Sequence, residues 1–302
     1  MIPGISVVIP TFNRKHLLEE GLPAILSQTI LSALYEVIVV SDGSTDGTAG
    51  YITLLQKTHS NLKFIQQENS GPAAARNRGA SEAKAEILAF TDDDCIPASN
   101  WLESILKVFS EKKIIGIQGR TSTYRKLRTP LTQQIDNENG HPAIPTCNAA
   151  FLTAAFRQIG GFDITFPFAH NEDADFAWRL EKIGETSFEK SVHVIHPPRK
   201  DSFLKIINRS KMLESEFLLF YKDPQAYKTH RNSSPWKTIY FEVFFLHQIR
   251  HLKSHVGYFF KPHLMVTGLL IDLCVWVNLI LFFPRFIRAD KKYRTQFEGS
   301  SL

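Results

Sequence analysis

The chain has 302 residues, of which 43% are hydrophobic and 22% charged, a composition that can bury a globular core. Its three cysteines, Cys95, Cys147 and Cys274, are widely spaced and odd in number, which excludes a disulfide framework and a cysteine-rich zinc site and favours a reducing environment. The net charge of +5 is uneven: residues 1–198 hold 18 Lys+Arg against 22 Asp+Glu, and residues 199–302 hold 17 against 8. We therefore expect two regions with different partners.

Short runs rich in isoleucine and valine alternate with helix-like stretches through the first half of the chain. The runs are predicted as strands at 5–10, 35–40, 62–67, 85–90 and 114–119. The stretches between them are predicted as helices at about 14–29, 45–58, 72–84 and 99–111. Strands separated by such helices form βαβ units, so we predict an α/β fold, Rossmann-like, with a mainly parallel sheet flanked by helices.

Polar motifs stand where three of these strands end. "PTFNR" follows the first strand, "SDGSTDGT" the second and "TDDDCIP" the fourth. Ligands of parallel sheets bind beyond the carboxyl ends of the strands. The sequence therefore predicts a ligand site at this edge of the sheet.

The triplet Asp92, Asp93 and Asp94 is the most unusual of these motifs. Neighbouring carboxylates resist full ionisation, so three in a row indicate a bound cation. In extended or turn backbone, Asp92 and Asp94 point the same way and can hold one ion while Asp93 faces elsewhere. Mg²⁺ or Mn²⁺ fits two carboxylates plus phosphate oxygens. The alternative is an acidic loop that the following helix N-terminus favours.

The middle of the chain is less regular. Residues 120–150 are predicted as loop with one short helix, and helical spacing returns at 171–185. The start of that helix carries Glu172, Asp173 and Asp175. Acids in a first helical turn either serve a site or stabilise the helix through its dipole, and the residues alone leave both open.

Six motifs in order carry a resemblance to a known family. They are "SVVIPTFNR", "VVSDGSTDGT", "GPAAARNRGA", "AFTDDDCIP", "CNAAFLTAAFRQIGGFD" and "NEDADFAWRL". Over residues 5–196 this series resembles the inverting family 2 glycosyltransferases, which have the GT-A fold. The resemblance implies a nucleotide-sugar-binding and catalytic domain over 1–198. It leaves 199–302 as a basic, aromatic and mostly helical C-terminal region.

The resemblance also implies the roles of the donor-binding residues. Asp92 and Asp94 would hold Mn²⁺ or Mg²⁺ against the departing nucleoside diphosphate, and Asp93 would touch the ribose or sugar. Asp42 would accept from the imide N–H of uracil or thymine, which favours a UDP or dTDP donor; its alternative is a turn with Gly43. The rest of the predicted nucleotide-sugar set is Arg76, Asn77, Pro10, Thr11 and Asn13.

The acceptor hydroxyl needs a base, and "HNEDADFAWRL" supplies it. By resemblance Asp173 is the base and Glu172 positions the acceptor or the base. Direct attack opposite the diphosphate would invert the stereochemistry. His196 is predicted as a third metal ligand, with His193 as its competitor, since their opposite parity along a strand prevents both from facing the site equally.

Residues 264–283 form a 20-residue apolar stretch that Asp272 and Asn278 interrupt. The length would span a bilayer, but Asp272 near its centre would cost roughly 2.5–3.5 kcal/mol. A single span would also place the basic tail on the far side of the membrane from a cytosolic catalytic region, against the tendency of basic residues to stay on the cytoplasmic side. We therefore favour a monotopic region on the cytoplasmic face of the cell membrane, its basic residues meeting anionic lipids. One or two spans, or a buried or dimer-interface helix, are the alternatives.

The predicted function is sugar transfer from a nucleoside-diphosphate sugar to an acceptor hydroxyl, on a lipid-linked or envelope glycan. One rival is a nucleotidyltransferase, which would want a glycine-rich loop after the first strand, where "PTFNRKHLL" has no glycine. Another is a non-catalytic membrane-surface module that binds sugar nucleotides. We expect no nucleic-acid binding, because the aromatics of the basic tail lie in long apolar runs.

Overall fold

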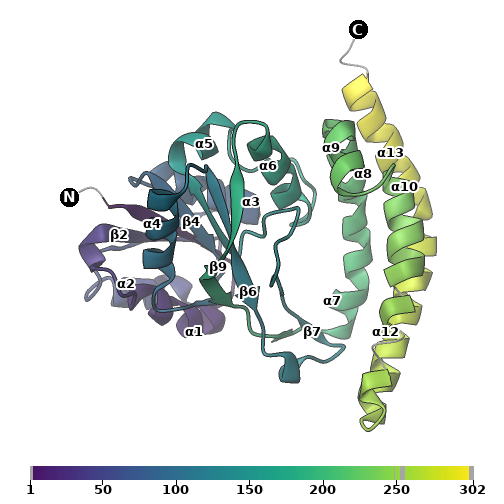
Figure 1. The fold of residues 1–302 in the computed structure, drawn as a ribbon. Helices are drawn as coiled ribbons and strands as arrows, with labels where there is room; N and C mark the ends of the chain where they lie inside the picture. The colour runs from purple at the N-terminus through teal and green to yellow at the C-terminus, as the bar shows by residue number, and fades with distance from the viewer. Residues whose placement is uncertain (1–2, 248, 252–255, 299–302) are drawn as a thin grey trace. The chain divides into compact units, whose positions relative to one another are not determined.

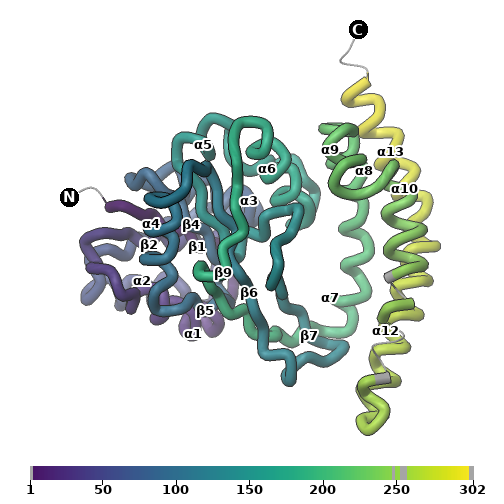
Figure 2. The backbone as a smooth tube through the Cα atoms, in the orientation of Figure 1, coloured from purple at the N-terminus to yellow at the C-terminus, as the bar shows by residue number. Residues whose placement is uncertain are grey.

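The structure is a computed structural model that describes residues 3–247, 249–251 and 256–298. The chain forms two compact units, which Figures 1 and 2 show from the same side. The first, here called the sheet unit, comprises Met1–Tyr124, Gln134–Thr165 and Glu172–Pro197. The second, the helical unit, comprises Arg125–Gln133, Phe166–Asn171 and Pro198–Leu302. The chain thus crosses between the units several times.

The sheet unit contains an eight-stranded sheet in the order β3-β2-β1-β4-β8-β6-β9-β5. Strands β1 to β4 run parallel, β6 and β9 are parallel to each other, and β8 is antiparallel to both of its neighbours. The predicted α/β fold with a mainly parallel sheet is therefore confirmed. The strands are β1 (Ile5–Thr11), β2 (Tyr35–Asp42), β3 (Leu62–Gln67), β4 (Ile87–Thr91), β5 (Ile96–Pro97), β6 (Gly116–Ser122), β8 (Asn148–Leu152) and β9 (Thr186–Ile195).

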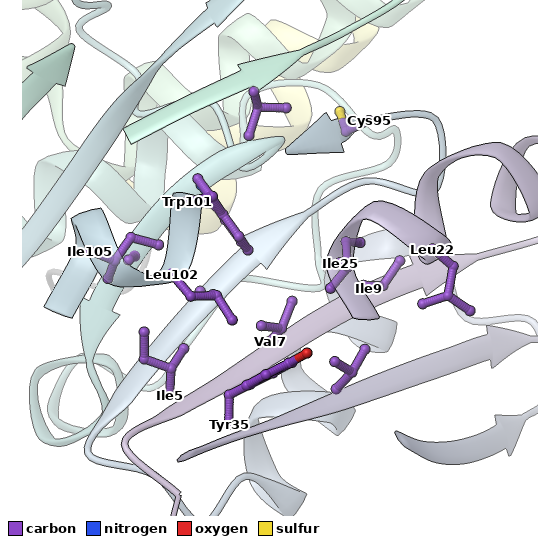
Figure 3. Close-up of a cluster of buried hydrophobic side chains, with 14 of the residues drawn as sticks. Ile5, Val7, Ile9, Leu22, Ile25, Tyr35, Cys95, Trp101, Leu102 and Ile105 are labelled. Carbon is purple, nitrogen blue, oxygen red and sulfur yellow. The ribbon is translucent and has the colours of Figure 1, made fainter. Parts of the chain in front are cut away.

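Helices cover the sheet on both faces, which is why β1 is buried along its whole length. On one face, Ile5, Val7 and Ile9 of β1 pack in a core with side chains of α1 and α4 (Figure 3). On the other face α3 lies so close that a Cβ on Gly79 would come within 2.4 Å of Val8. The helices of this unit are α1 (Lys15–Leu26), α2 (Thr48–Leu55), α3 (Pro72–Glu82), α4 (Trp101–Glu111), α5 (Thr153–Gln158) and α6 (Glu172–Glu181), with a short 3-10 turn, η1 (Ser32–Leu34).

The helical unit has a two-stranded antiparallel ribbon of β7 (Thr132–Gln133) and β10 (Arg199–Lys200), and is otherwise helical. Its long C-terminal helices pack against its earlier ones, α12 against α7 and α13 against α8. The helical elements are η2 (Arg125–Leu127), α7 (Phe203–Asn208), η3 (Arg209–Glu214), α8 (Ser215–Lys222), α9 (Pro224–His230), α10 (Pro235–Lys237), η4 (Thr238–His247), η5 (Val256–Tyr258), α12 (Pro262–Leu281) and α13 (Phe283–Glu298).

The apolar stretch predicted at 264–283 forms α12, the one helix of the described residues that is long and apolar enough to cross a membrane. Only 22% of its apolar window is buried inside the protein. The core helix of a soluble protein would be mostly buried, so this exposure distinguishes α12 from such a helix.

Candidate active site

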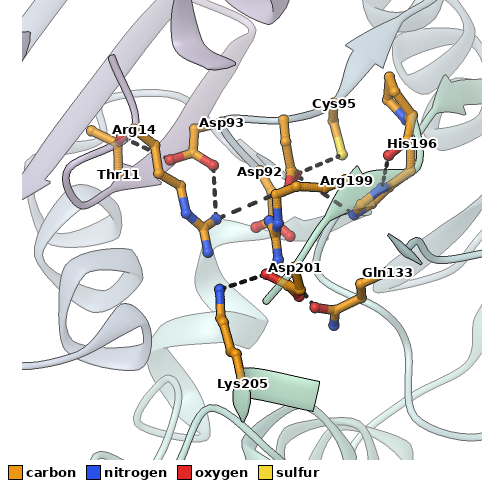
Figure 4. Close-up of polar contacts among 12 residues, drawn as sticks. Thr11, Arg14, Asp92, Asp93, Cys95, Gln133, His196, Arg199, Asp201 and Lys205 are labelled. Atoms are coloured by element: carbon orange, nitrogen blue, oxygen red, sulfur yellow. Dashed lines mark hydrogen bonds and ion pairs between the residues drawn. The ribbon is translucent and has the colours of Figure 1, made fainter. Parts of the chain in front are cut away.

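The sheet register places the acidic triplet beside the end of β1. Val8 of β1 is opposite Phe90 of the parallel strand β4, so three residues further on Thr11 is next to Asp93. The Thr11 hydroxyl donates to Asp93 Oδ2 over 2.8 Å, and Arg14 Nη1 donates to Oδ1 over 3.1 Å (Figure 4). Burial raises the pKa of Asp93 to about 6, although Arg14 opposes this. Asp93 therefore faces protein partners.

Asp92 lies against a buried arginine. Nη2 of Arg76 donates to Asp92 Oδ1 over 2.8 Å, and Nη1 lies 3.6 Å from Glu172 Oε1. Burial alone would raise the pKa of Asp92, but the charge and hydrogen bond of Arg76, with the charges of His196 and Arg14, together hold that pKa below its ordinary value. Arg76 thus connects Asp92, which is predicted to bind the nucleotide sugar, to Glu172, which comes one residue before the predicted catalytic base Asp173.

This connection leaves polar atoms unsatisfied. Nε and Nη1 of Arg76 and Oε2 of Glu172 are buried and have no hydrogen-bond partner among the described residues. Both residues are only 6% exposed. Buried polar groups are normally bonded, so unsatisfied atoms at a strand end indicate a place where a polar ligand binds. Burial, and then Asp173, raise the pKa of Glu172 to about 7.

The third aspartate meets the predicted histidine. Ile96 of β5 pairs with Ile195 of the antiparallel strand β9, which brings Asp94 beside His196. Asp94 Oδ1 lies 3.6 Å from His196 Nε2, and these two with Cys95 offer three possible ligand atoms within 4.8 Å of one another. Figure 4 labels Cys95 and His196 of this group. Burial raises the pKa of the Cys95 thiol well above its ordinary value, so the thiol stays protonated and is a poor ligand.

The hydrogen bonds of His196 fit a cation at this position. Its Nδ1 lies 3.2 Å from the carbonyl oxygen of Pro197, which can only accept, so Nδ1 carries the proton. In the neutral form of the imidazole, the lone pair of Nε2 therefore faces the carboxylate of Asp94. Two acceptors face each other favourably only when a proton or a metal ion lies between them. Nitrogen and carboxylate oxygen are suitable donors for Mn²⁺.

The two histidines of the predicted pair lie in different surroundings. Nε2 of His193 is 2.8 Å from the Ser122 hydroxyl. Burial, and then Arg120, lower the pKa of His193. His196 is therefore the histidine beside the acidic loop. The assignment of Asp92, Asp94 and His196 as one ligand set stays a prediction, since Asp92 is bonded to Arg76 in this structure.

The residues predicted to bind the nucleobase lie in β1 and in the loop that follows it, which is hydrogen-bonded to the loop after β2. Pro10 is buried in β1. Asn13 has a positive φ of 52°, and its Oδ1 accepts from the backbone N–H of Thr45 over 2.7 Å. This bond joins the loops after β1 and β2. Their contact with a nucleobase stays a prediction.

Asp42 closes the turn that leads into α3. Its Oδ1 accepts from the N–H of Ser70 over 2.8 Å and its Oδ2 from the N–H of Gly71 over 2.9 Å, and Gln67 donates a third bond of 2.7 Å. Asp42 thus orients the turn that precedes Arg76. A base contact by Asp42 stays a prediction, and the structural role stands beside it.

Asn77 and Asp175 have structural partners. Both ends of the Asn77 amide bond the backbone of Phe162, over 2.7 and 2.9 Å. Asp175 accepts from Arg179 over 2.8 Å, and Arg179 donates in turn to the carbonyl oxygens of Ile159 and Gly161. These contacts fix the loop before α6. A donor contact by Asn77 stays a prediction.

Asp173 lies in the first turn of α6 and is partly exposed, unlike its neighbours Glu172 and Asp175. Its carboxylate accepts from the N–H of Ala174 over 2.8 Å.

Arg14 is the charged residue that sequence reasoning missed at this edge. The signal was available, because Arg14 follows the strand that neighbours the strand of the acidic triplet.

Comparisons with known proteins agree on one family. The model of glycosyl transferase family 2 matches residues 6–170, more than half of the chain. Glycosyltransferase AglE of Haloferax volcanii is 41% identical over 103 residues, 34% of this chain and 34% of that protein. GalNAc(5)-diNAcBac-PP-undecaprenol beta-1,3-glucosyltransferase of Campylobacter jejuni is 34% identical over 112 residues, 36% of each chain. The matches thus span about a third of these relatives' length.

Solved structures agree on the fold. Mannosyltransferase PcManGT from Pyrobaculum calidifontis, in complex with GDP-Man and Mn²⁺, aligns with a TM-score of 0.59 at 22% identity, over 99% of this chain and 84% of that one. At this identity the likeness concerns the fold. The chain belongs to glycosyl transferase family 2 and has a GT-A type fold.

Proposed function

We propose that this chain is an inverting, metal-assisted glycosyltransferase that moves a sugar from a nucleoside-diphosphate sugar to an acceptor hydroxyl. The observation that carries the proposal is the linked set Asp92–Arg76–Glu172 beside the end of β4, in which Arg76 and Glu172 are buried and have unsatisfied polar atoms. The family match argues against the nucleotidyltransferase alternative. The non-catalytic module remains a possible outcome of the activity test.

Asp94 and His196 would hold Mn²⁺ or Mg²⁺, with Asp92 as the further predicted ligand. Such an ion supplies charge neutralisation to the leaving diphosphate. Arg76 would add charge-assisted hydrogen bonds to the same phosphates through its unsatisfied atoms. Pro10, Thr11, Asn13 and Asp42 would line the nucleoside side, with a UDP or dTDP donor favoured.

Asp173 would take the proton of the acceptor hydroxyl as that oxygen attacks the anomeric carbon from the side opposite the diphosphate. Glu172, with its pKa raised to about 7, is protonated in part of the molecules near neutral pH and can donate a hydrogen bond there. The two neighbouring acids would thus have different roles: Asp173 would accept the proton, and Glu172 would position the acceptor or the base.

The acceptor would be membrane-bound. The Campylobacter jejuni relative is named for an undecaprenol-linked substrate, and only 22% of the apolar window of α12 is buried inside this protein. We infer that residues 1–198 bind the donor and carry catalysis, while residues 199–302 lie monotopically on the cytoplasmic face of the membrane. The acceptor would then be a lipid-linked or envelope glycan.

A donor screen tests the proposal. The full chain is heated with UDP-glucose, UDP-GlcNAc, dTDP-glucose or GDP-mannose, each with Mn²⁺ and with EDTA. We expect at least one donor to raise the melting temperature in Mn²⁺ only, because a ligand bound to the native state stabilises it. Release of nucleoside diphosphate from that donor then shows catalysis. Absence of a metal-dependent shift and of release for all four would contradict the proposal.

A further inference from the structure

A buried polar network in the helical unit surrounds the carboxylate of Glu216. It joins α8, α9, η4 and the segment Phe166–Asn171. Each member is at most 6% exposed, although none is apolar: Asn171, Ser215, Glu216, Tyr227 and Thr238. Burying so many polar groups is favourable only when all are bonded, so such a network specifies one arrangement of the chain.

Both oxygens of Glu216 are used. Oε1 accepts from Nδ2 of Asn171 over 2.9 Å, and Oε2 accepts from the Tyr227 hydroxyl over 2.7 Å. Burial, and then the Glu216 carboxylate, raise the pKa of Tyr227, so its hydroxyl stays protonated and donates. The same hydroxyl lies 2.8 Å from Oγ1 of Thr238. Glu216 therefore fixes Asn171 to two helices.

Asn171 itself is held in an unusual conformation. Its φ is +75°, in the left-handed region that residues other than glycine rarely adopt. Its amide is bonded on both sides, because Nδ2 also donates to the Ser215 hydroxyl over 3.2 Å and Oδ1 accepts from Arg231 over 3.2 Å. The next two residues in the chain are Glu172 and Asp173. Asn171 is therefore the last residue before α6.

The rest of the short segment is fastened to the same unit. Nζ of Lys222 lies 5.4 Å from the centre of the Phe166 ring, and the guanidinium of Arg285 lies 5.6 Å from that of Phe168. Nδ1 of His170 is 2.8 Å from the Ser215 hydroxyl. Four of the six residues from 166 to 171 thus have side-chain contacts in the helical unit.

We propose that Glu216 and Tyr227 are positioning residues for the catalytic base, acting through Asn171. The inference rests on the proposed role of Asp173 and deepens it: the helical unit does more than associate with a membrane, since it holds the residue from which the chain enters the catalytic helix. Loosening this network rotates the first turn of α6 and misplaces Asp173, while the donor-binding loops after β1, β2 and β4 keep their contacts.

The test uses a swapped pair. Glu216→Gln turns one of the two acceptor oxygens into an amide donor, so either the bond from Asn171 or the bond from the Tyr227 hydroxyl is lost. Asn171→Asp sets two carboxylates against each other. The double variant restores one acceptor at 171 facing one donor at 216, and Oε1 of the new glutamine can still accept from Tyr227. We expect each single variant to lower kcat for nucleoside diphosphate release about tenfold or more, since small misplacement of a catalytic group is costly. The double variant should recover most of that loss.

Two further readouts separate positioning from general damage. Binding of UDP with Mn²⁺ should change less than about threefold in all variants. Tyr227→Phe is matched by Tyr240→Phe, which also removes one tyrosine hydroxyl bond within the helical unit, to the carbonyl of Leu279. Of these two tyrosine variants, we expect kcat to fall in Tyr227→Phe and to stay at the wild-type value in Tyr240→Phe.

Hydrogen–deuterium exchange supplies a test that does not depend on activity. Amides at the start of α6 should exchange faster in Glu216→Gln than in Tyr240→Phe, while those of α4 should not change. Unchanged kcat and exchange in Glu216→Gln, or a double variant no better than the worse single one, would overturn the inference. A wild-type chain that releases no nucleoside diphosphate would count against the proposed function instead, and the exchange result would still decide this one.

Discussion

Arg76 is the residue that links the two parts of the candidate site, the acidic triplet at Asp92 and the start of α6 at Glu172. It is buried, it pairs with Asp92 and it lies 3.6 Å from Glu172, so one cation offsets two carboxylates. Removal of one partner from a buried pair leaves an uncompensated charge, which is strongly destabilising. The positions of Asp92 and Glu172 are therefore linked through a side chain that touches both.

Asp173→Asn tests the base assignment. The substitution keeps the shape of the side chain but removes its ability to accept a proton, so kcat should fall roughly 10²- to 10⁴-fold. Affinity for UDP with Mn²⁺ should stay close to that of the wild type. Glu181→Gln at the other end of α6 is the control and should leave both unchanged. Equal losses of binding and turnover in Asp173→Asn would remove Asp173 from this role.

The raised pKa of Glu172 predicts a pH dependence of stability. Its folded pKa of about 7 lies above the ordinary 4.5, so the native state holds this proton more tightly than the unfolded chain. The stabilisation is complete below the ordinary pKa and is lost as the pH rises through about 7. Without divalent metal, the melting temperature of the wild type should therefore drop more between pH 5 and pH 8 than that of Glu172→Gln. Parallel curves would contradict the shift.

At the scale of elements, α1 supports the acidic loop directly. A Cβ on Gly21 would come within 2.5 Å of the carbonyl oxygen of Cys95, which is backbone and cannot move aside cheaply. Gly21→Ala should lower stability by about 1–3 kcal/mol through this clash and should weaken Mn²⁺-dependent UDP binding. Chemical denaturation and calorimetry measure the two effects.

Gly50 provides the matched control. It lies exposed in α2, and no atom is within 4 Å of the position its Cβ would take. Gly50→Ala should stabilise the protein by about 0.5–1 kcal/mol, because alanine loses less backbone entropy in a helix. Equal effects of the two substitutions would mean that α1 does not approach the acidic loop as described.

The parallel elements could be predicted because each carries its own signal. Strands β1, β2 and β4 are largely apolar, buried runs that end in turn residues, and the helices between the strands have helical spacing. The expected helix at 45–58 begins later, at Thr48, because Asp46 accepts from the Thr48 N–H and Gly47 has a positive φ. β8 carries no such signal: its sequence, NAAFL, has no isoleucine or valine, and it runs directly into α5 without a turn between them.

From the residues alone, without the family resemblance, the site could be predicted only where its residues are near one another in sequence. The acidic triplet and the Glu172–Asp173 pair stand out locally. The pairing of β5 with β9 that brings Asp94 beside His196 joins residues about a hundred positions apart, and no local pattern encodes that register. The bonds of Asn77 with Phe162 are similarly distant, so a side chain that resembles a ligand residue in sequence has a structural role in the fold.

At the scale of the whole molecule, the basic C-terminal region presents an apolar surface on α12. Asp272, the residue that argued against a span, is buried beside His251, with 3.3 Å between Oδ1 and Nδ1. Asn278 donates to the carbonyl of Ile207. The exposed side is an apolar stripe at helical spacing, made of Val266, Leu269, Leu270, Leu273, Val277, Ile280 and Leu281. In α12 the apolar side faces outward and Asp272 is buried, whereas a surface helix of a water-soluble protein buries its apolar side. An outward apolar side of this kind fits a lipid surface.

Vesicle flotation tests this surface. The full chain should float with vesicles that contain phosphatidylglycerol, and less at high salt. A triple change of Leu270, Leu273 and Ile280 to Asp should weaken binding at least about tenfold, since each leucine or isoleucine buried in lipid contributes about 1.5–3 kcal/mol. The same change at Leu31, Leu54 and Ile164, exposed apolar residues of the sheet unit, should have no effect. Equal loss in both sets would contradict a specific surface.

The central claim is that a divalent cation held at Asp94 and His196 anchors the donor diphosphate. Isothermal titration of UDP in Mn²⁺ and in EDTA tests it most directly. We expect Mn²⁺ to tighten binding by the wild type and by His193→Ala, and this gain to vanish in Asp94→Asn and in His196→Ala while metal-free binding persists. A gain of wild-type size in either of the last two variants would contradict the account.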